Sequence, residues 1–156
     1  MAITVPVHMG YELEVRAPAA EVFELLSDVP ASVSFFPKVH KLTDLGDGVY
    51  QWEMEKVGTP QVNIQTVYAS CYSARKARGT VTWKPVPGIG NALVGGGWKI
   101  TDRKGSTHIE LKIDGELTVP LPALMKVVVA PVVGSEFEKL VEKYLANLAR
   151  RLGGEI

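Results

Sequence analysis

A long apolar stripe near the C-terminal end is the sequence feature that most constrains the fold. Its members recur at offsets of 0, 3, 4, 7, 8, 11 and 15 residues: Phe137, Leu140, Val141, Tyr144, Leu145, Leu148 and Leu152. This spacing is typical of one face of a helix, and it predicts a helical segment from about Pro122 to Leu152. We expect Pro131 and Gly134 to kink or divide this helix.

The chain before this helix has mainly the two-residue period of strands. Apolar residues alternate with polar ones from Ile3 to Val15, which predicts a long half-buried strand. Turn residues then separate six further strand patterns: Val39–Leu45, Val49–Val57, Val62–Tyr72, Ala77–Trp83, Ala92–Thr101 and Ser106–Val119. We expect a bulge at Gly115 in the last of them. The sequence therefore predicts seven strands, six of them consecutive.

Two short helices are expected between the first strand and the other six. Pro18 suits the first turn of a helix, and Ala19–Asp28 has one apolar face. Pro30 ends this helix, and Ala31–Phe36 is typical of one or two further helical turns. The pattern contains no linker or internal repeat, so a single α+β domain over residues 1–156 is expected.

The charges of the chain balance in total but not locally. The 17 Lys and Arg residues and 17 Asp and Glu residues give a net charge of zero, which argues against nucleic-acid binding. Residues 1–37 contain five acids and one arginine, a net charge of −4, whereas residues 75–104 contain seven basic residues and one acid, a net charge of +6. The basic stretch is either a solvated surface or a rim that meets an anionic ligand group or anionic lipid.

The remaining composition argues against several classes of protein. Cys71 is the single cysteine, so an internal disulfide is excluded. No signal peptide is recognisable, and no segment reaches the roughly 20 uninterrupted apolar residues of a membrane-spanning helix, so a cytoplasmic protein is expected. His8, His40 and His108 lack the spacing of metal ligands, and Gly88–Leu93 lacks the third glycine of a dinucleotide-binding loop. Neither a metal nor a cofactor is predicted.

The segment Ala17–Asp28 (APAAEVFELLSD), followed by Phe35-Phe36-Pro37, resembles the opening of the START-like, or SRPBCC, superfamily. The likeness covers nearly the whole chain and is greatest to the polyketide cyclase/dehydrase and lipid-transport branch. It implies a helix-grip fold, in which a curved seven-stranded antiparallel sheet wraps around a long C-terminal helix, with two short helices after the first strand. It also implies a hydrophobic cavity between sheet and helix for a lipid, sterol, quinone or polyketide-like molecule.

The more apolar side of each strand is expected to face this cavity. That side contains few charges and many aromatic and hydroxyl groups, which is typical of pockets for small molecules. Together with the apolar start of the last helix, it gives the predicted cavity-lining set: Tyr11, Tyr50, Trp52, Met54, Ile64, Thr66, Tyr68, Val81, Trp83, Trp98, Ile109, Leu111, Leu124, Met125 and Val128. A one-residue slip of a strand would exchange its members for their neighbours.

Two features near the predicted cavity leave alternatives open. Gly95–Gly97 lie within a strand, where they either let the sheet curve or leave space for a ligand. The apolar stretch from Leu121 to Val133 is either core or a lid, weakened by Pro131, that admits a hydrophobic ligand. Transient contact of this stretch with a membrane surface, with Lys126 beside anionic headgroups, is a further alternative.

Binding or transport of a hydrophobic small molecule is the function expected. An acid/base enzyme normally needs a tuned titratable group beside its substrate, and the predicted interior offers only phenols and hydroxyls. The alternative is a polyketide cyclase or aromatase that uses a cavity tyrosine or a rim arginine such as Arg78. A second alternative is a protein-interaction module similar to co-chaperones, although that branch usually has a Trp-Trp pair where this chain has Phe35-Phe36.

Overall fold

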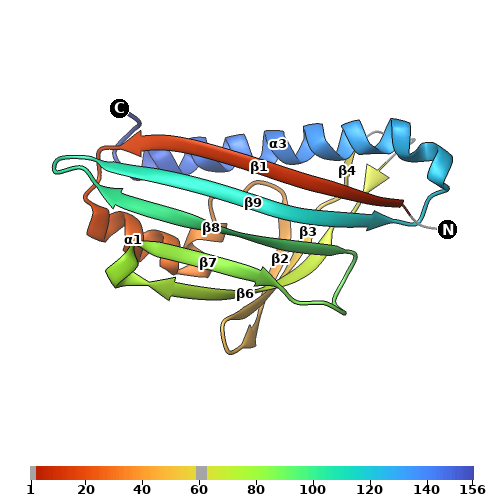
Figure 1. The fold of residues 1–156 in the computed structure, drawn as a ribbon, viewed down its shortest axis with the longest axis horizontal. Coiled ribbons are helices and arrows are strands. Elements are labelled where there is room, and N and C mark those ends of the chain that lie inside the picture. Colours follow the sequence, from red (N-terminus) through yellow and green to blue (C-terminus); the bar gives the residue numbers. More distant parts are fainter. Residues whose placement is uncertain (1–2, 59–62) are drawn as a thin grey trace.

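A seven-stranded antiparallel sheet is the largest layer of the computed structural model, which describes residues 3–58 and 63–156, without the side chains of 57–58 and 63–64 (Figure 1). The strand order is β1-β9-β8-β7-β6-β3-β2, so the first and last strands of the chain are neighbours. The bounds are β1 Ile3–Val15, β2 Val39–Gly46, β3 Val49–Met54, β6 Val67–Arg75, β7 Thr80–Pro85, β8 Ala92–Asp102 and β9 Thr107–Val119. The predicted seven-stranded sheet is confirmed.

The predicted strand over 62–72 is divided in the structure. Two short strands, β4 (Val57–Gly58) and β5 (Asn63–Ile64), pair with each other outside the main sheet, and β6 begins only at Val67. Residue 62, where the predicted strand begins, lies outside the described residues. The interruption places Gln65 and Thr66 between two sheets.

The predicted bulge at Gly115 is wrong. Gly115 pairs with Val7 of β1 and Val94 of β8 in an unbroken register on both sides. The absence of a side chain at Gly115 instead lets β8 and β9 approach closely, because a Cβ atom there would lie 2.5 Å from the carbonyl oxygen of Leu93. The register shifts are in β2, where it pairs with β3.

Two short helices follow β1, as predicted, with slightly different bounds. Helix α1 is Ala19–Ser27 and α2 is Val29–Val33. Asp28 starts α2, because its side chain accepts a hydrogen bond from the Ala31 amide at 3.2 Å. Short 3₁₀ turns, η1 (Lys76–Arg78) and η2 (Ala123–Met125), precede β7 and the last helix.

Helix α3 (Lys126–Arg151) is the long C-terminal helix, and Pro131 does not divide it. Proline removes the hydrogen bond that the Val127 carbonyl would accept. Because Val127 and Pro131 both lie on the exposed side of the helix, water can take the place of that bond. No helix among the described residues is long and apolar enough to cross a membrane.

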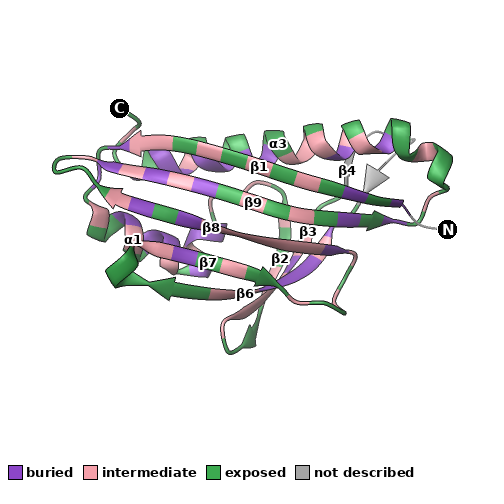
Figure 2. Ribbon diagram, in the orientation of Figure 1, coloured by how far each residue is buried: buried purple, intermediate pink, exposed green. Residues whose placement is uncertain are grey.

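The three helices lie on one face of the sheet, and the core fills the space between them (Figure 2). One buried cluster joins the start of α3 to the ends of β1 and β9, and a second joins the rest of α3 to α1 and the centre of the sheet. The predicted apolar stripe of α3 is buried, except for the half-buried Phe137. The interior between these clusters contains the candidate site.

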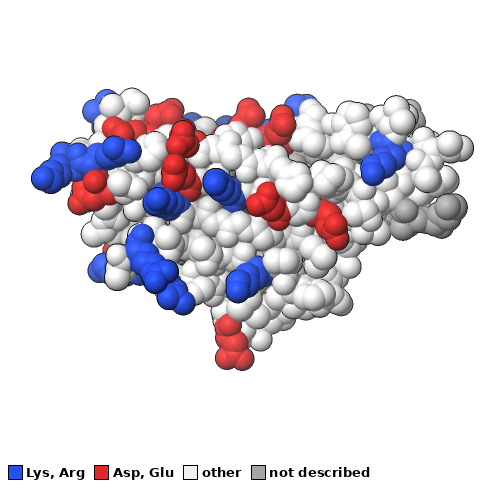
Figure 3. All heavy atoms as spheres, viewed as in Figure 1, with Lys and Arg blue, Asp and Glu red and all other residues white. Residues whose placement is uncertain are grey.

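The charged side chains lie on the outside of the molecule. All seven basic residues of the segment 75–104 are exposed. On the face seen in Figure 3, Lys and Arg side chains are interspersed with Asp and Glu side chains over the strands. Lys76, Arg78 and Lys99 line an open groove beside α1, which also contains Asp102.

Candidate functional site

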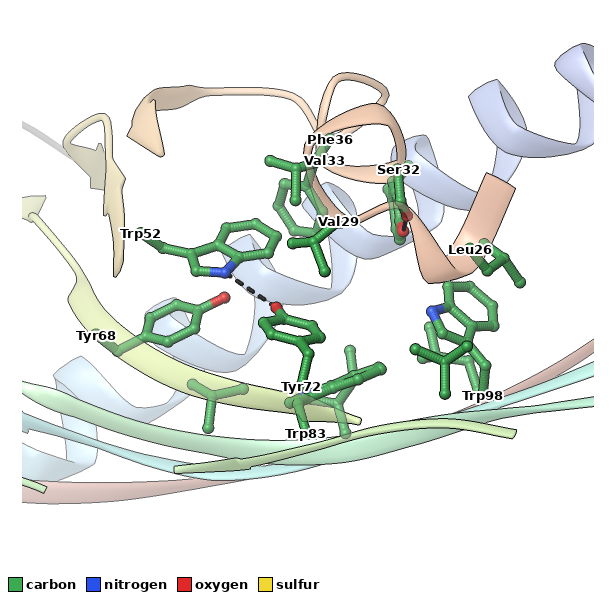
Figure 4. A pocket seen from close by; sticks show the side chains of 15 residues that line it. Leu26, Val29, Ser32, Val33, Phe36, Trp52, Tyr68, Tyr72, Trp83 and Trp98 are labelled. Atoms are coloured by element: carbon green, nitrogen blue, oxygen red, sulfur yellow. Dashed lines mark hydrogen bonds between the residues drawn. The ribbon is translucent and has the colours of Figure 1, made fainter. Parts of the chain in front are cut away.

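A cavity of about 60 Å³ lies between the sheet, α2 and α3 (Figure 4). Aromatic rings form much of its wall, and every tryptophan of the chain is among them. The lining consists of Leu26, Val29, Ser32, Val33, Phe36, Trp52, Tyr68, Tyr72, Val81, Trp83, Val94, Trp98, Leu111, Ile113 and Tyr144. We call this space the aromatic cavity.

A second cavity, also of about 60 Å³, lies towards the start of α3, and we call it the aliphatic cavity. Its lining is Val7, Met9, Phe36, Met54, Thr66, Tyr68, Ala92, Val94, Ile113, Gly115, Glu116, Leu117, Phe137 and Val141. Phe36, Tyr68, Val94 and Ile113 line both cavities, so their side chains form the partition between the two spaces.

More than half of the predicted cavity-lining residues line one of these spaces. Those at the aromatic cavity are Trp52, Tyr68, Val81, Trp83, Trp98 and Leu111, and those at the aliphatic cavity are Met54, Thr66 and again Tyr68. All of them lie on strands or directly beside one, where alternation defines two faces.

The other predicted strand residues lie elsewhere. Ile109 is buried in the core without lining either cavity. Tyr50 lies in an open groove between α2 and β2, and Tyr11 is half-buried at the edge strand β1. Burial and then the carboxylates of Glu142 and Glu138 raise the pKa of Tyr11. The side chain of Ile64 lies outside the described part of the structure.

The predictions for the start of the last helix need correction. Leu124 is 91% exposed and Val128 is 50% exposed, and the half-buried Met125 lines neither cavity. The helix turns Val129 and Val133 inwards instead. Apolar residues occur all round this part of the helix, so the sequence pattern does not determine which side is buried.

Two polar residues that line the aromatic cavity, Ser32 and Tyr144, are not in the predicted cavity-lining set. The hydroxyls of Ser32 on α2 and Tyr144 on α3 share a short buried hydrogen bond. Tyr144 belongs to the apolar stripe of the last helix, so its inward position was recognisable, but its hydroxyl was not assigned to the site. Ser32 carries no such signal, because α2 has only five residues.

A second polar group lies on the opposite side of the aromatic cavity. The indole nitrogen of Trp52 donates a hydrogen bond to the Tyr72 hydroxyl at 3.0 Å. Figure 4 shows the Tyr68 hydroxyl directed towards this pair. Burial raises the pKa of Tyr68, Tyr72 and Tyr144, so all three phenols stay protonated at neutral pH. They are hydrogen-bonding groups and not anions.

Phe36 separates the interior from the outside. Its ring meets Trp52 edge-on with 5.5 Å between ring centroids, and it lies 4.9 Å from the ring of Tyr144. The same side chain lines both cavities and also the open groove of about 400 Å³ between α2 and β2. Among the described residues, Phe36 is thus the one side chain that borders both cavities and this groove.

Gly96 makes room for a wall of the aromatic cavity. It pairs with Trp83 of β7, and a Cβ atom at Gly96 would lie 3.1 Å from the Trp83 ring and would collide with the Lys112 carbonyl oxygen. The missing side chain therefore lets the indole pack directly on the backbone of β8. The flanking Gly95 and Gly97 allow similarly close contacts with β7.

The ionisable side chains that the structure describes lie away from the aromatic cavity, apart from the tyrosines. Arg78 lies in the exposed groove beside α1 and does not line either cavity. At the aliphatic cavity, Glu116 is exposed. Among the described residues, one group offers metal-ligand atoms within 4.8 Å of one another: Glu12, His108 and Glu110, all on the solvent side of β1 and β9.

Comparisons with solved structures reveal the same fold in proteins of several kinds. The Zhui aromatase/cyclase from Streptomyces sp. R1128 is 18% identical, with coverage of 94% of this chain and 91% of that chain and a TM-score of 0.62. A START superfamily protein from Mycobacterium smegmatis is 16% identical, covers 93% and 98%, and has a TM-score of 0.66. A norcoclaurine synthase from Thalictrum flavum is 16% identical, covers 96% and 97%, and has a TM-score of 0.61.

These identities are low, so the structural likeness shows the fold and not the activity. A search of curated proteins found no matching relative. A family model described as polyketide cyclase / dehydrase and lipid transport matches residues 6–153, nearly the whole chain. The protein therefore belongs to the START-like polyketide cyclase/dehydrase and lipid-transport family.

Proposed function

We propose that this protein binds or transports a hydrophobic small molecule, such as a lipid, sterol, quinone or polyketide-like compound, between the sheet and α3. The observation that carries the proposal is the aromatic cavity, whose wall is apolar except for neutral hydroxyl groups and the tryptophan indole N–H groups. Apolar walls with a few placed hydrogen-bonding groups are typical of sites that bind small molecules. The protonated phenols suit a carbonyl or hydroxyl oxygen of such a ligand.

The ligand must enlarge the space that it enters. Each cavity has about 60 Å³, whereas pockets for small molecules usually have roughly 300–1,000 Å³. Because Phe36 borders both cavities and the groove between α2 and β2, we infer that the ligand enters through this groove and displaces the Phe36 ring. The exposed Leu124 and Val128 support no lid at the start of α3.

Helix α2 is held in place while that ring moves. The Asn147 side chain of α3 donates to the Phe35 carbonyl at 2.9 Å, and Ser32 is hydrogen-bonded to Tyr144. These two contacts tie α2 and the residue before Phe36 to α3. Side-chain rotation of Phe36 is therefore a smaller change than displacement of the helix.

A second candidate function is a cyclase or aromatase that acts on a polyketide in the same space. The buried phenols favour it, because a protonated tyrosine can donate a hydrogen bond to a carbonyl oxygen as that atom gains negative charge. The structural similarity to an aromatase/cyclase is consistent with this candidate. Arg78 has no part in it, since that side chain lies at a different groove.

Tryptophan fluorescence tests the binding proposal directly, because all three tryptophans line the aromatic cavity. We expect a panel of quinones, sterols, fatty acids and aromatic polyketides to contain compounds that change the emission with saturable dependence on concentration. Native mass spectrometry of gently purified protein should detect the same class of compound.

A variant with a larger side chain in the partition between the two cavities tests the same proposal, with a matched control. Val94→Phe places a ring between the two cavities and should abolish the fluorescence response, whereas Leu45→Phe adds the same ring at an exposed site and should preserve it. The proposal is wrong if no member of the panel binds. Conversion of a polyketide that is lost in Tyr68→Phe or Tyr72→Phe would favour the enzyme. A stable protein complex in a pull-down, with no small-molecule binding, would favour the interaction module.

A further inference from the structure

The aliphatic cavity contains a buried hydroxyl that the fold leaves unpaired. Thr66 is 2% exposed and lines this cavity. Among the residues that the structure describes, its Oγ1 is the one buried side-chain nitrogen or oxygen without a hydrogen-bond partner. An unpaired buried hydroxyl destabilises a fold, whereas an apolar side chain of the same shape does not.

The other buried polar side chains of the described chain are all paired. Ser70 donates to the Val94 carbonyl at 2.8 Å, and Thr107 donates to the Ala17 carbonyl at 2.7 Å. Ser32 is paired with Tyr144. Among these buried hydroxyls, only that of Thr66 lacks a hydrogen-bond partner within the described chain. A ligand in the cavity could supply that partner.

The backbone around Thr66 is held firmly, so its side chain has a defined position. The Asn91 side chain accepts a hydrogen bond from the Val67 amide and donates one to the Gln65 carbonyl, both at 2.9 Å. The Met54 amide donates to the Thr66 carbonyl at 2.9 Å. These contacts fix the residues on either side of Thr66 and satisfy its own carbonyl, but none of them uses its hydroxyl.

Aliphatic side chains form much of the wall of this cavity. Val7, Met9, Met54 and Leu117 line the same space, and the ring of Tyr68 separates it from the aromatic cavity. A ligand that extends through the partition would place an apolar portion here. One oxygen on that portion, at the position of Oγ1, would supply the missing hydrogen bond.

We propose that the aliphatic cavity is a subsite for the oxygen-bearing aliphatic portion of the ligand, with the Thr66 hydroxyl hydrogen-bonded to an alcohol or ketone oxygen. The aromatic cavity then receives a ring of the same molecule, so the ligand class is an aryl or alicyclic compound with an oxygenated aliphatic arm. This inference rests on the proposed binding function and specifies its ligand.

Two probes that differ by one oxygen test the subsite: phenylhexanol and hexylbenzene. Thr66→Val should weaken phenylhexanol binding roughly fivefold, the usual value of one hydrogen bond, and leave hexylbenzene binding unchanged or tighter. Thr66→Ser retains the hydroxyl and should retain the preference of the wild type. Fluorescence titration of the three tryptophans measures all of these affinities.

Thr107→Val is the matched control, because it removes a hydroxyl that is paired and lies away from both cavities. Without ligand, the Tm should fall in Thr107→Val and rise in Thr66→Val. The inference is overturned if Thr66→Val weakens both probes equally, if it lowers the Tm as the control does, or if a crystal structure of the complex shows a water and no ligand oxygen on Oγ1. Failure of every panel compound and both probes to bind the wild type would instead overturn the binding function itself.

Discussion

At the scale of single residues, the wall of the aromatic cavity depends on a glycine that has no side chain. Gly96 has no side chain, and the Trp83 ring occupies the space in front of it. Gly134 of α3 is different, because nothing lies within 4 Å of the place where its Cβ would be. We therefore expect substitution by alanine to change the stability of the protein in opposite directions at these two positions.

Gly96→Ala should destabilise the protein by about 2 kcal/mol or more, because the added methyl group would overlap the backbone of β9 and displace Trp83. Gly134→Ala should stabilise it by about 1 kcal/mol, because alanine favours a helix over the flexible unfolded chain. Urea denaturation of both variants measures the two effects. Equal stability of the two variants would contradict the assignment of Gly96 to a close contact.

The buried tyrosines predict a loss of stability in alkaline solution. Burial raises the pKa of Tyr68, Tyr72 and Tyr144 in the fold above the ordinary value of 10.0, so the folded protein retains protons that the unfolded chain releases. Their contribution is complete below pH 10, and it is lost progressively as the pH rises above that value. Denaturation midpoints between pH 8 and about 11 should show this decline. Tyr72→Phe should make the decline shallower, whereas Tyr50→Phe, which alters a phenol in an open groove, should change it less.

At the scale of the elements, we infer that α2 and the residues after it control access to the interior. The helix has only five residues, yet its hydrogen bonds to α3 and the position of Phe36 make it part of the cavity wall. Its role is to hold one aromatic side chain at the junction of three spaces.

Phe36→Ala should open that junction. We expect ligand association to become at least several-fold faster and the free energy of unfolding to fall by about 2–4 kcal/mol, since a packed ring is removed. Phe23→Ala on α1 is the control, because Phe23 is also half-buried but borders a different groove. It should lower stability without changing the association rate in stopped-flow fluorescence. Equal association rates in wild type and Phe36→Ala would place the entrance elsewhere.

The elements also determine how far the sequence could predict the site. Strand alternation defines an inner face once the apolar side is known, so the sequence could predict cavity positions for Trp52, Tyr68 and Trp98. Leu124 and Val128 were wrongly placed because an apolar helix segment has no distinguishable buried side. Phe36 owes its importance to the packing of α2 against α3, which is a contact between distant segments that no local period encodes.

At the scale of the whole molecule, the distribution of apolar groups on the surface is uneven. The exposed large hydrophobic residues of the described chain are Leu45, Leu124, Val127, Val128 and Ile156. Three of these five lie close together in the chain beside the exposed Lys126: Leu124 in η2, and Val127 and Val128 in the first turn of α3. A patch of this kind would be stabilised by contact with an apolar phase.

We expect this patch to contact membranes while a ligand is loaded or released. Leu124 and Val127 are 91% and 83% exposed, and the single charge between them is positive, so vesicles with anionic headgroups should bind the protein better than neutral ones. Flotation with phosphatidylglycerol vesicles should recover the wild type, and recovery should fall at least fivefold in Leu124→Ser/Val127→Ser. Leu45→Ser removes an exposed apolar side chain from β2 and should leave recovery unchanged, because Leu45 does not belong to the patch. If the double variant floats as well as the wild type, the patch does not bind lipid, and the ligand must reach the groove beside Phe36 from solution or from a protein partner.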